Sequence, residues 1–276
     1  MKNNLRFLII ALVTCSLLCA GYLTAQTPDY HPQVIAGVDY FRERVDEQLP
    51  LVEDLLSALK TGDLSKAKMA YVNARPPYEE IEVYAGSFEQ EDSDIDARPY
   101  SFDDGENSDE FKGFHKIEAF IYRDEDLASA IPYGEELIDS VKSLRVKLND
   151  INNFNASLNF NGMLSLTTEV PAKKISSEEE TWSDQSLLIF KHNWIGIHSQ
   201  FEPYKMVLDK AISDEVEAAY QACMETIKPF FTPGKVAAAP YSSLDAQQRG
   251  AIVEASYNYR DALLKAKEAL EMPDPA

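Results

Sequence analysis

Apolar residues recur at every third or fourth position over most of the chain, and this spacing limits the possible folds more than any other feature. It places apolar side chains along one face of an α-helix, which then has to pack against other helices. No segment convincingly alternates polar and β-branched residues as a half-buried strand does. The sequence therefore predicts an all-α fold. The clearest example lies between residues 33 and 60, at Val34, Val38, Phe41, Val45, Leu49, Val52, Leu55, Leu56 and Leu59.

Recognisable breaks separate the expected helices. Pro50 is expected to kink or divide the first helix, because proline lacks the amide proton that a helix interior needs. Gly62 is expected to end that helix, and Asp63 to cap the next one. Further helices are expected through residues 67–72, 77–84, 111–122, 133–148, 187–201, 215–230 and 243–270, with a shorter, irregular helix at 152–170.

Two other segments carry local signals. Residues 88–112 lack periodicity and are rich in acidic residues, so a long loop is expected there. Ser177 and Glu180 have the spacing of a capping box, which predicts a helix start at this point. Seven or eight helices pack most simply in up-down fashion. We therefore expect two similar four-helix bundles, an N-terminal one at residues 30–150 and a C-terminal one at residues 151–270.

The first 25 residues form a segment that is set aside from the fold. Two basic residues, an apolar run over residues 8–18 and small residues near Ala25 give the layout of a secretory signal peptide, residues 1–25. The apolar run is too short for a good membrane-spanning helix. Cys15 and Cys19 leave lipid attachment as a minority alternative. The sequence thus predicts export to the periplasm.

The charge balance indicates the kind of partner. The 276 residues include 26 Lys and Arg against 46 Asp and Glu, a formal net charge of −20. Phosphates would be repelled, which argues against general affinity for nucleic acid or for anionic membranes and leaves cations as natural partners. An acidic surface that only keeps the protein soluble is the commoner alternative. Outside the signal segment Cys223 is the one cysteine, so no internal disulfide can form, and its apolar surroundings predict a small core residue.

The motif most relevant to chemistry is Gly113-Phe114-His115-Lys116-Ile117-Glu118. On a helix, His115 and Glu118 project from one face and can hold one metal ion. The Glu-x-x-His pairs of carboxylate-bridged bundles use this geometry in reverse order. Taken alone, the spacing is more often that of a surface pair than of a metal site. The zinc-protease signatures are absent, and four histidines leave few imidazoles for a catalytic zinc with three ligands.

Acidic residues cluster at three other places. Glu79 and Glu82 share a helical face, although a solvated helix start would also carry such a pair. An EF-hand loop starting at Asp92 is excluded, because the required glycine and the final glutamate are missing. Residues 178–180 are three consecutive glutamates, for which simple capping is the alternative interpretation.

Four motifs in this order resemble the imelysin-like domain of the EfeO/EfeM iron-uptake proteins, over residues 30–270. The resemblance implies two four-helix bundles, export, and metal binding through the His-x-x-Glu helix and nearby carboxylates; some similar proteins bind alginate. The chain looks like the short EfeM form, which lacks a cupredoxin domain. The motifs are Ala74-Arg75-Pro76-Pro77-Tyr78-Glu79-x-Ile81-Glu82, Asp94-Ile95-Asp96-Ala97-Arg98, Gly113-Phe114-His115-Lys116-Ile117-Glu118 and Glu178-Glu179-Glu180-x-Trp182-Ser183.

The same resemblance implies a ligand set and partners. Iron, ferrous or ferric, is the expected ion, and zinc, manganese or copper(II) also suit carboxylates with one imidazole. A membrane iron permease and a periplasmic peroxidase are the implied protein partners. Glu179 and Glu180 compete with Glu178 for one ligand role. The residues that the resemblance marks as ligands are His115, Glu118, Glu79, Glu82, Asp96 and Glu178.

The sequence therefore predicts a non-enzymatic, periplasmic metal-binding protein of an iron uptake system. Two other classes of function remain open at this stage. A polysaccharide-binding protein is suggested by the relatives that bind alginate, although a polyanion would be repelled by the acidic chain. A metallopeptidase is suggested by the peptidase-like classification of the imelysin group, although the missing histidines argue against it.

Overall fold

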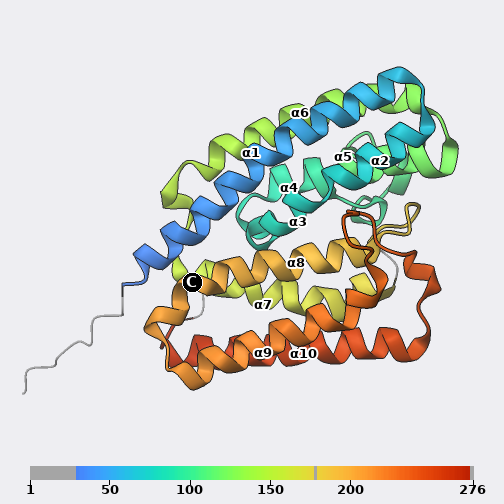
Figure 1. Ribbon diagram of the computed structural model, residues 1–276. Coiled ribbons are helices and arrows are strands. Elements are labelled where there is room, and N and C mark those ends of the chain that lie inside the picture. Colours follow the sequence, from blue (N-terminus) through green and yellow to red (C-terminus); the bar gives the residue numbers. More distant parts are fainter. Residues whose placement is uncertain (1–28, 177–178, 274–276) are drawn as a thin grey trace, which may run out of the picture.

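The chain is built from α-helices joined by turns and by longer irregular segments, such as residues 97–112 and 228–245 (Figure 1). The computed structural model describes residues 29–176 and 179–273, and over these ranges it contains no β-strand, only one isolated antiparallel bridge between Phe231 and Ala238. The predicted all-α fold is confirmed. Within the described ranges no helix combines the length and the hydropathy that a membrane span needs. The predicted signal segment, with Cys15 and Cys19, lies outside the described residues.

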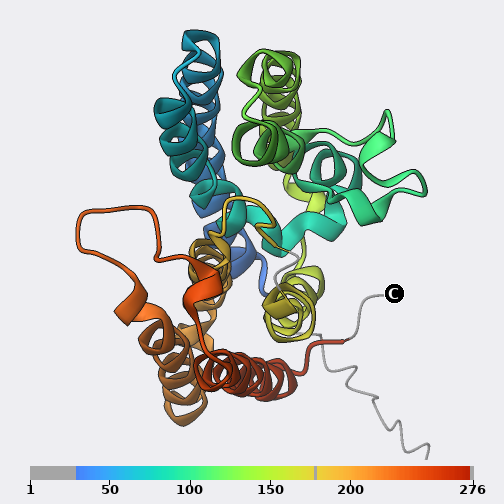
Figure 2. The same ribbon diagram turned by 90° about the vertical axis from the view of Figure 1, so that its right-hand side faces the viewer.

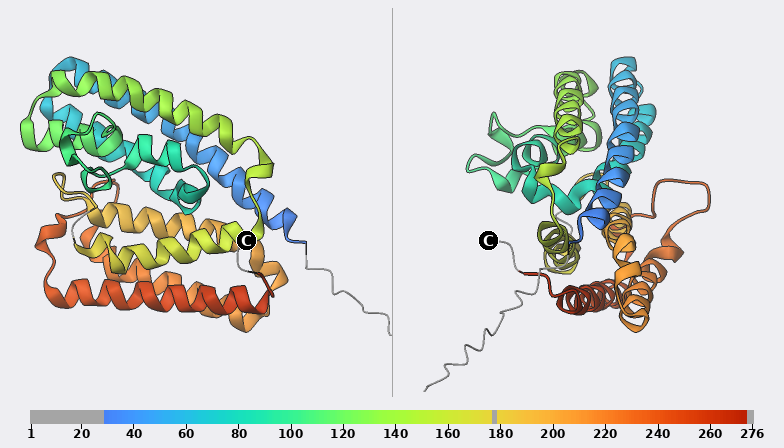
Figure 3. Two further views of the ribbon diagram at one scale, coloured as in Figure 1. Left: turned by 180° about the vertical axis from the view of Figure 1, so that it is seen from behind. Right: turned by 90° about the vertical axis from the view of Figure 1, so that its left-hand side faces the viewer.

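The helices form two groups (Figure 1). In the C-terminal group, α7 and α8 lie nearest to the N-terminal group, and α9 and α10 cover their far side; the view from behind in Figure 3 shows the same order. The N-terminal group comprises α1 (His31–Thr61), α2 (Leu64–Ala74), α3 (Pro76–Ile81), α4 (Glu89–Asp96), α5 (Gly113–Glu118) and α6 (Leu127–Leu148). The C-terminal group comprises α7 (Ala156–Ala172), α8 (Ser186–Phe201), α9 (Lys210–Ile227) and α10 (Ala246–Ala269).

The two groups are packed directly on one another. Helix α3 and the 3-10 turn η1 (Glu82–Ser87) contact α8 and α7 respectively, and Figure 2 shows these short helices between the two groups. Two glycines allow the close approach. A side chain at Gly162 would place its Cβ 1.9 Å from the carbonyl oxygen of Val83, and one at Gly196 would place it 2.2 Å from that of Glu80. The predicted division near residue 150 stays a prediction.

Helix α1 runs unbroken through Pro50, so of the two predicted outcomes, a kink or a division, the division does not occur. A proline inside a helix costs about 3 kcal/mol. Burial of one large apolar side chain contributes about 1.5–3 kcal/mol, and α1 buries several against α2 and α6. The packing therefore outweighs the proline. As predicted, Gly62 ends α1 with a positive φ of 70°, and the Asp63 carboxylate accepts a hydrogen bond from the Lys66 amide at 3.1 Å.

The sequence predictions failed at two other places. The expected loop at residues 88–112 contains α4, because Ile95 packs into the core and the Glu91 carboxylate is paired with Lys147. The helix expected from Ser177 begins instead at Ser186; the described residues 179–185 are not helical, and Ser177 lies outside the described residues. The shorter helix expected at residues 152–170 is present as α7, which at 17 residues is shorter than α1, α6 and α10. Cys223 is buried, as predicted.

Candidate metal centre

A group of ionisable side chains is enclosed where the short helices α3, α4 and α5 meet α8 and the segment before it. No member exposes more than 14% of its side chain, and most expose 4% or less. We call this group the buried cluster. Its members are the carboxylates Glu79, Glu82, Asp96, Glu118, Glu179 and Glu180, the cations Arg75, Arg98 and Lys174, and His115.

The His-x-x-Glu motif forms one end of the buried cluster. Nδ1 of His115 lies 3.2 Å from Oε2 of Glu118, so the two residues share a helical face as their spacing predicted. Nε2 of His115 points to the third predicted residue, Asp96, whose Oδ1 lies 3.4 Å away. That separation is longer than a normal N–H···O hydrogen bond. One imidazole nitrogen therefore remains available inside the cluster.

Backbone geometry fixes this end of the buried cluster. Gly113 begins α5 with a φ of +77°, and any Cβ there would lie 2.3 Å from the carbonyl oxygen of Ile95. Only glycine allows α5 to start this close to the end of α4. Oε1 of Glu118 accepts the amide protons of Trp182 and Ser183 at 2.9 and 2.7 Å. These two bonds tie α5 to the non-helical segment before α8.

Arg75 links three of the carboxylates. Its guanidinium nitrogens lie 2.6 Å from Glu79, 2.6 Å from Asp96 and 2.8 Å from Glu180. The planar group also lies over the ring of Phe114, with 4.6 Å between Cζ and the ring centroid. A guanidinium offers five N–H donors in a rigid fork, which suits several carboxylates at once. Arg75 therefore holds three separate segments together.

Lys174 occupies the opposite end of the buried cluster. Its Nζ donates to both carboxylate oxygens of Glu82 at 2.9 and 2.7 Å, to Glu179 at 3.1 Å and to Oδ1 of Asn193 at 2.9 Å. A third acidic residue, Glu79, has an oxygen 3.9 Å away. The side-chain amide of Asn193 donates in turn to Glu79 at 3.0 Å and to Glu82 at 2.7 Å.

Three carboxylates are close enough together to bind one ion. Glu79, Asp96 and Glu179 each offer an oxygen, and these oxygens lie within 4.8 Å of one another. Metal–oxygen bonds of about 2.0–2.2 Å would bring such a set onto a single ion with small movements. Arg98 pairs with two of the three, with Asp96 at 3.4 Å and with Glu179. No ion is needed to hold these residues in place.

The charges in the buried cluster do not balance. Six carboxylates face three permanent cations, so three negative charges are in excess when every acid is ionised. Burial raises the pKa of Glu79 well above its usual range despite Arg75, and burial also raises the pKa of Glu82. Burial and the nearby Glu118 raise the pKa of Glu180 to about 7. Protons therefore neutralise part of the excess.

The pKa values of Asp96, Glu118 and His115 shift against the direction that burial alone would give. Burial alone would raise the pKa of Asp96, but Arg75 and Arg98 outweigh it and hold that pKa well below its usual range. The pKa of Glu118 is lowered against burial, chiefly by His115. Burial would lower the pKa of His115, yet Asp96 and Glu118 raise it to about 9. The protons on groups with a raised pKa, such as His115 and Glu180, are ones that a metal ion could displace.

The structure brings together five of the six residues that the sequence proposed as ligands, and Glu178 lies outside the described residues. The neighbouring glutamates, Glu179 and Glu180, both belong to the buried cluster. The sequence reasoning gave no role to the cations. Arg75 and Arg98 stand inside the quoted motifs and could have been found there. Lys174 stands in no motif, so nothing in the sequence marked it.

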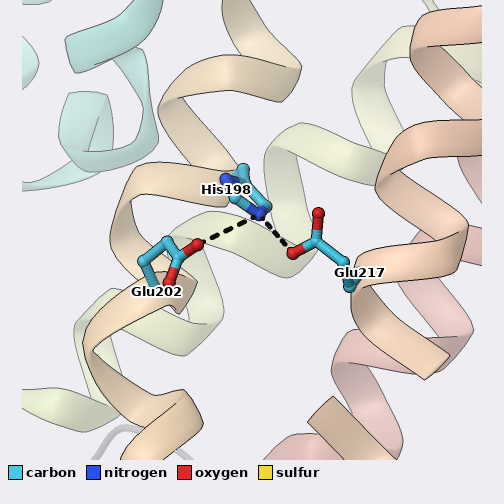
Figure 4. A group of neighbouring side chains, drawn as sticks. All are labelled: His198, Glu202 and Glu217. Atoms are coloured by element: carbon cyan, nitrogen blue, oxygen red, sulfur yellow. Dashed lines mark hydrogen bonds and ion pairs between the residues drawn. The ribbon is translucent and has the colours of Figure 1, made fainter. Parts of the chain in front are cut away.

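A second, smaller cluster lies on the C-terminal group (Figure 4). Nε2 of His198 is 2.9 Å from Glu217 and 3.8 Å from Glu202. Lys205 lies 3.1 Å from both of these carboxylates, and the imidazole stacks on Tyr220. Two acids thus face one permanent cation, Lys205, and one imidazole at a partly exposed position. The excess of acids over permanent cations is one here, against three in the buried cluster.

Comparison with known proteins gives a family and several relatives. The sequence matches the family model described as Imelysin over residues 38–267. A protein of Staphylococcus aureus (strain MRSA252), named Efem/EfeO family lipoprotein, is 30% identical over 182 residues, which cover 64% of each chain. The Iron uptake system component EfeM of Pseudomonas syringae pv. syringae (strain B728a) is 31% identical over 181 residues, which cover 64% of this chain and 63% of that protein. The matches span just under two thirds of these relatives.

Proposed function

The chain belongs to the imelysin family, and we propose that it is an exported, non-enzymatic binding protein that takes up iron in its buried cluster. The family match agrees with the resemblance that the four motifs indicated. The name of the Pseudomonas syringae relative supports a role in iron uptake, and the name of the Staphylococcus aureus relative supports a location outside the cytoplasm. In this proposal the ion is the cargo and the chain is its carrier.

One observation carries the proposal, namely the excess of carboxylates in the buried cluster. An uncompensated buried charge is costly, so such an excess is normally neutralised by a proton or a bound cation. Burial and the nearby Glu118 raise the pKa of Glu180 to about 7, so a proton on Glu180 can fill part of this role without metal. A divalent or trivalent cation would neutralise two or three charges at once, which suits ferrous or ferric iron.

The ligand chemistry is consistent with iron. Carboxylate oxygens from Glu79, Asp96 and Glu179 would supply the hard ligands, and Nε2 of His115 would supply one imidazole. Glu118 would orient His115 through its other ring nitrogen, as partners of metal-bound histidines commonly do. Zinc, manganese and copper(II) suit the same donors, so transport partners rather than affinity would have to select the metal. A membrane iron permease and a peroxidase-type protein are the proposed partners.

The two alternative functions gain no support from the site. The buried cluster contains one imidazole, His115, among the described residues, whereas catalytic zinc sites of peptidases usually take two or more. Its members are almost fully enclosed, so a sugar ring of alginate would not reach them. A single ion is the ligand class that the site accommodates.

The test is calorimetric titration of the metal-free protein with zinc, and with ferrous iron under anaerobic conditions. We expect about one equivalent to bind, and the double variant His115→Ala with Glu118→Gln to lose that binding, because it removes the imidazole and one acid. The matched control is His198→Ala, which removes an imidazole from the second cluster and should leave the titration unchanged. Retention of the wild-type stoichiometry and affinity by the double variant would refute the assignment.

A further inference from the structure

Lys174 holds the position and the ligands that a bound cation would need. Its side chain is 4% exposed, and its Nζ is surrounded by oxygens of Glu82, Glu179 and Asn193 within 3.1 Å. Oxygens converging on one positive charge are the environment that a metal ion also seeks. The ammonium group is therefore an internal counter-ion at one end of the proposed metal site.

The ammonium of Lys174 and the proposed ion would bind to the same carboxylates. Glu179 contributes one carboxylate oxygen to the trio that could bind an ion. The same side chain also accepts a hydrogen bond from Nζ of Lys174. Glu79 belongs to the trio as well and lies 3.9 Å from Nζ. An ion bound by this trio would repel an ammonium held by two of its members, because like charges in a poorly solvated site interact strongly.

Lys174 also has a place to which it can move. Glu82, its closest partner, is 9% exposed and lines a cleft of about 310 Å³ between η1 and α7. Glu169 lines the same cleft and is a second acid there. None of the described residues that line the cleft is basic. The ammonium can therefore turn toward these two acids while staying paired.

The two arginines are less suited to such movement. Arg75 is fixed by three carboxylates and by its contact with Phe114. A guanidinium that satisfies several partners in one plane loses all of them when it turns, whereas an ammonium on a flexible stem exchanges its partners one at a time. Arg98 carries the same planar group and pairs with both Asp96 and Glu179. The ammonium of Lys174 is therefore the cation of the buried cluster best suited to yield its place.

We propose that Lys174 is a tethered competitor of the cargo ion: its ammonium occupies part of the site, moves toward Glu82 and Glu169 when the ion binds, and returns as the ion leaves. This inference rests on the proposed function. The consequence is that the site binds the ion less tightly and releases it faster, because the ammonium already neutralises part of the carboxylate charge in the empty site. A carrier that has to hand over its ion benefits from such a lowered barrier to release.

The test measures zinc affinity by chelator competition and zinc release by a stopped-flow chelator chase, on wild type and on Lys174→Met. Methionine keeps the stem and removes the charge. We expect Lys174→Met to bind zinc about tenfold or more tightly and to release it correspondingly more slowly. The matched control is Lys205→Met, which removes the same charge from the second cluster and should change neither quantity. Tighter binding confined to Lys174→Met supports the competitor role.

Several outcomes would overturn the inference. Equal or weaker zinc binding by Lys174→Met, in a wild type that binds zinc, rejects the competitor and leaves the proposed function intact. An equal gain in Lys205→Met assigns the effect to net charge and also rejects it. If wild type binds neither zinc nor ferrous iron, the proposed function fails and the inference fails with it.

A second comparison covers the case in which Lys174→Met does not fold. The double variant Lys174→Met with Glu82→Gln removes one charge of each sign and so keeps the charge balance of the cluster. We expect it to bind zinc more tightly than Glu82→Gln alone, because the competitor is missing while the remaining acids are the same. Equal affinities of these two variants would reject the inference.

Discussion

His115 is the residue at which protons and metal ions compete most directly. Its Nε2 faces Asp96 and its Nδ1 faces Glu118, and both carboxylates favour the protonated imidazolium. Against burial, they raise the pKa of His115 to about 9. A metal ion can bind only the neutral imidazole. At neutral pH the metal-free protein therefore holds a proton that an incoming ion has to displace.

The sign of the pH dependence follows from this competition. Below the pKa of about 9 for His115 each unit of rising pH makes the neutral imidazole more available, so zinc affinity should rise. Displacement of this one proton predicts about a tenfold gain in affinity for each pH unit between about pH 6 and pH 8. The raised pKa of Glu180 adds to the gain in the lower part of this range.

Chelator competition across this pH range measures the slope, and calorimetry in buffers of different ionisation enthalpy counts the protons released. His198→Ala is the control, because the second cluster should contribute nothing to the slope. An affinity for zinc that does not change with pH would show that His115 is not a ligand.

At the scale of the elements, the long amphipathic helices were predictable and the short ones were not. Helices α1 and α10 follow from apolar spacing alone, since each buries one face along its whole length. Helix α4 escaped prediction because the acidic residues that suggest a loop are stabilised by partners distant in sequence, such as Lys147 for Glu91. The sequence assigned Glu179 and Glu180 to a helix start, whereas both side chains point into the buried cluster. Glu180 pairs with Arg75, and Glu179 pairs with Arg98 and Lys174.

The contact between the two helix groups depends on the glycines that allow it, and this is testable at Gly196. Alanine there would place its Cβ 2.2 Å from the backbone carbonyl of Glu80, so α8 and α3 would have to separate. Overpacking of this kind typically costs about 1–3 kcal/mol, and more where backbone has to move. We expect Gly196→Ala to lower the free energy of unfolding by at least that amount, measured by urea denaturation.

Gly250 provides the matched control. It also lies inside a helix, α10, but nothing approaches within 4 Å of the position of its Cβ. Alanine there should stabilise the protein by up to about 1 kcal/mol through its higher helix propensity. Equal effects of the two substitutions would contradict the role assigned to Gly196 in the close approach of α8 to α3.

At the scale of the whole molecule, the buried cluster joins parts of the chain that are far apart in sequence. Arg75 and Glu180 are 105 positions apart, as their numbers show, yet their side chains lie 2.8 Å apart. Four motifs placed His115, Glu118 and the acidic residues in the site, but spacing cannot show which cation neutralises which acid. Lys174 was missed for this reason, because its role exists only once the turn after α7 has been packed against η1 and α8.

This long-range assembly predicts that the ion stabilises the fold. The unfolded chain has no preformed site, so an ion that binds only the folded state raises its stability by about 2.7 kcal/mol at a free concentration 100 times the dissociation constant. We expect zinc to raise the midpoint of thermal unfolding of the wild type, and a chelator to reverse the rise. The double variant His115→Ala with Glu118→Gln should show no rise, whereas His198→Ala should show the full one. An equal rise in the double variant would place the stabilising ion elsewhere on this acidic chain, outside the cluster formed by α3, α4, α5 and α8.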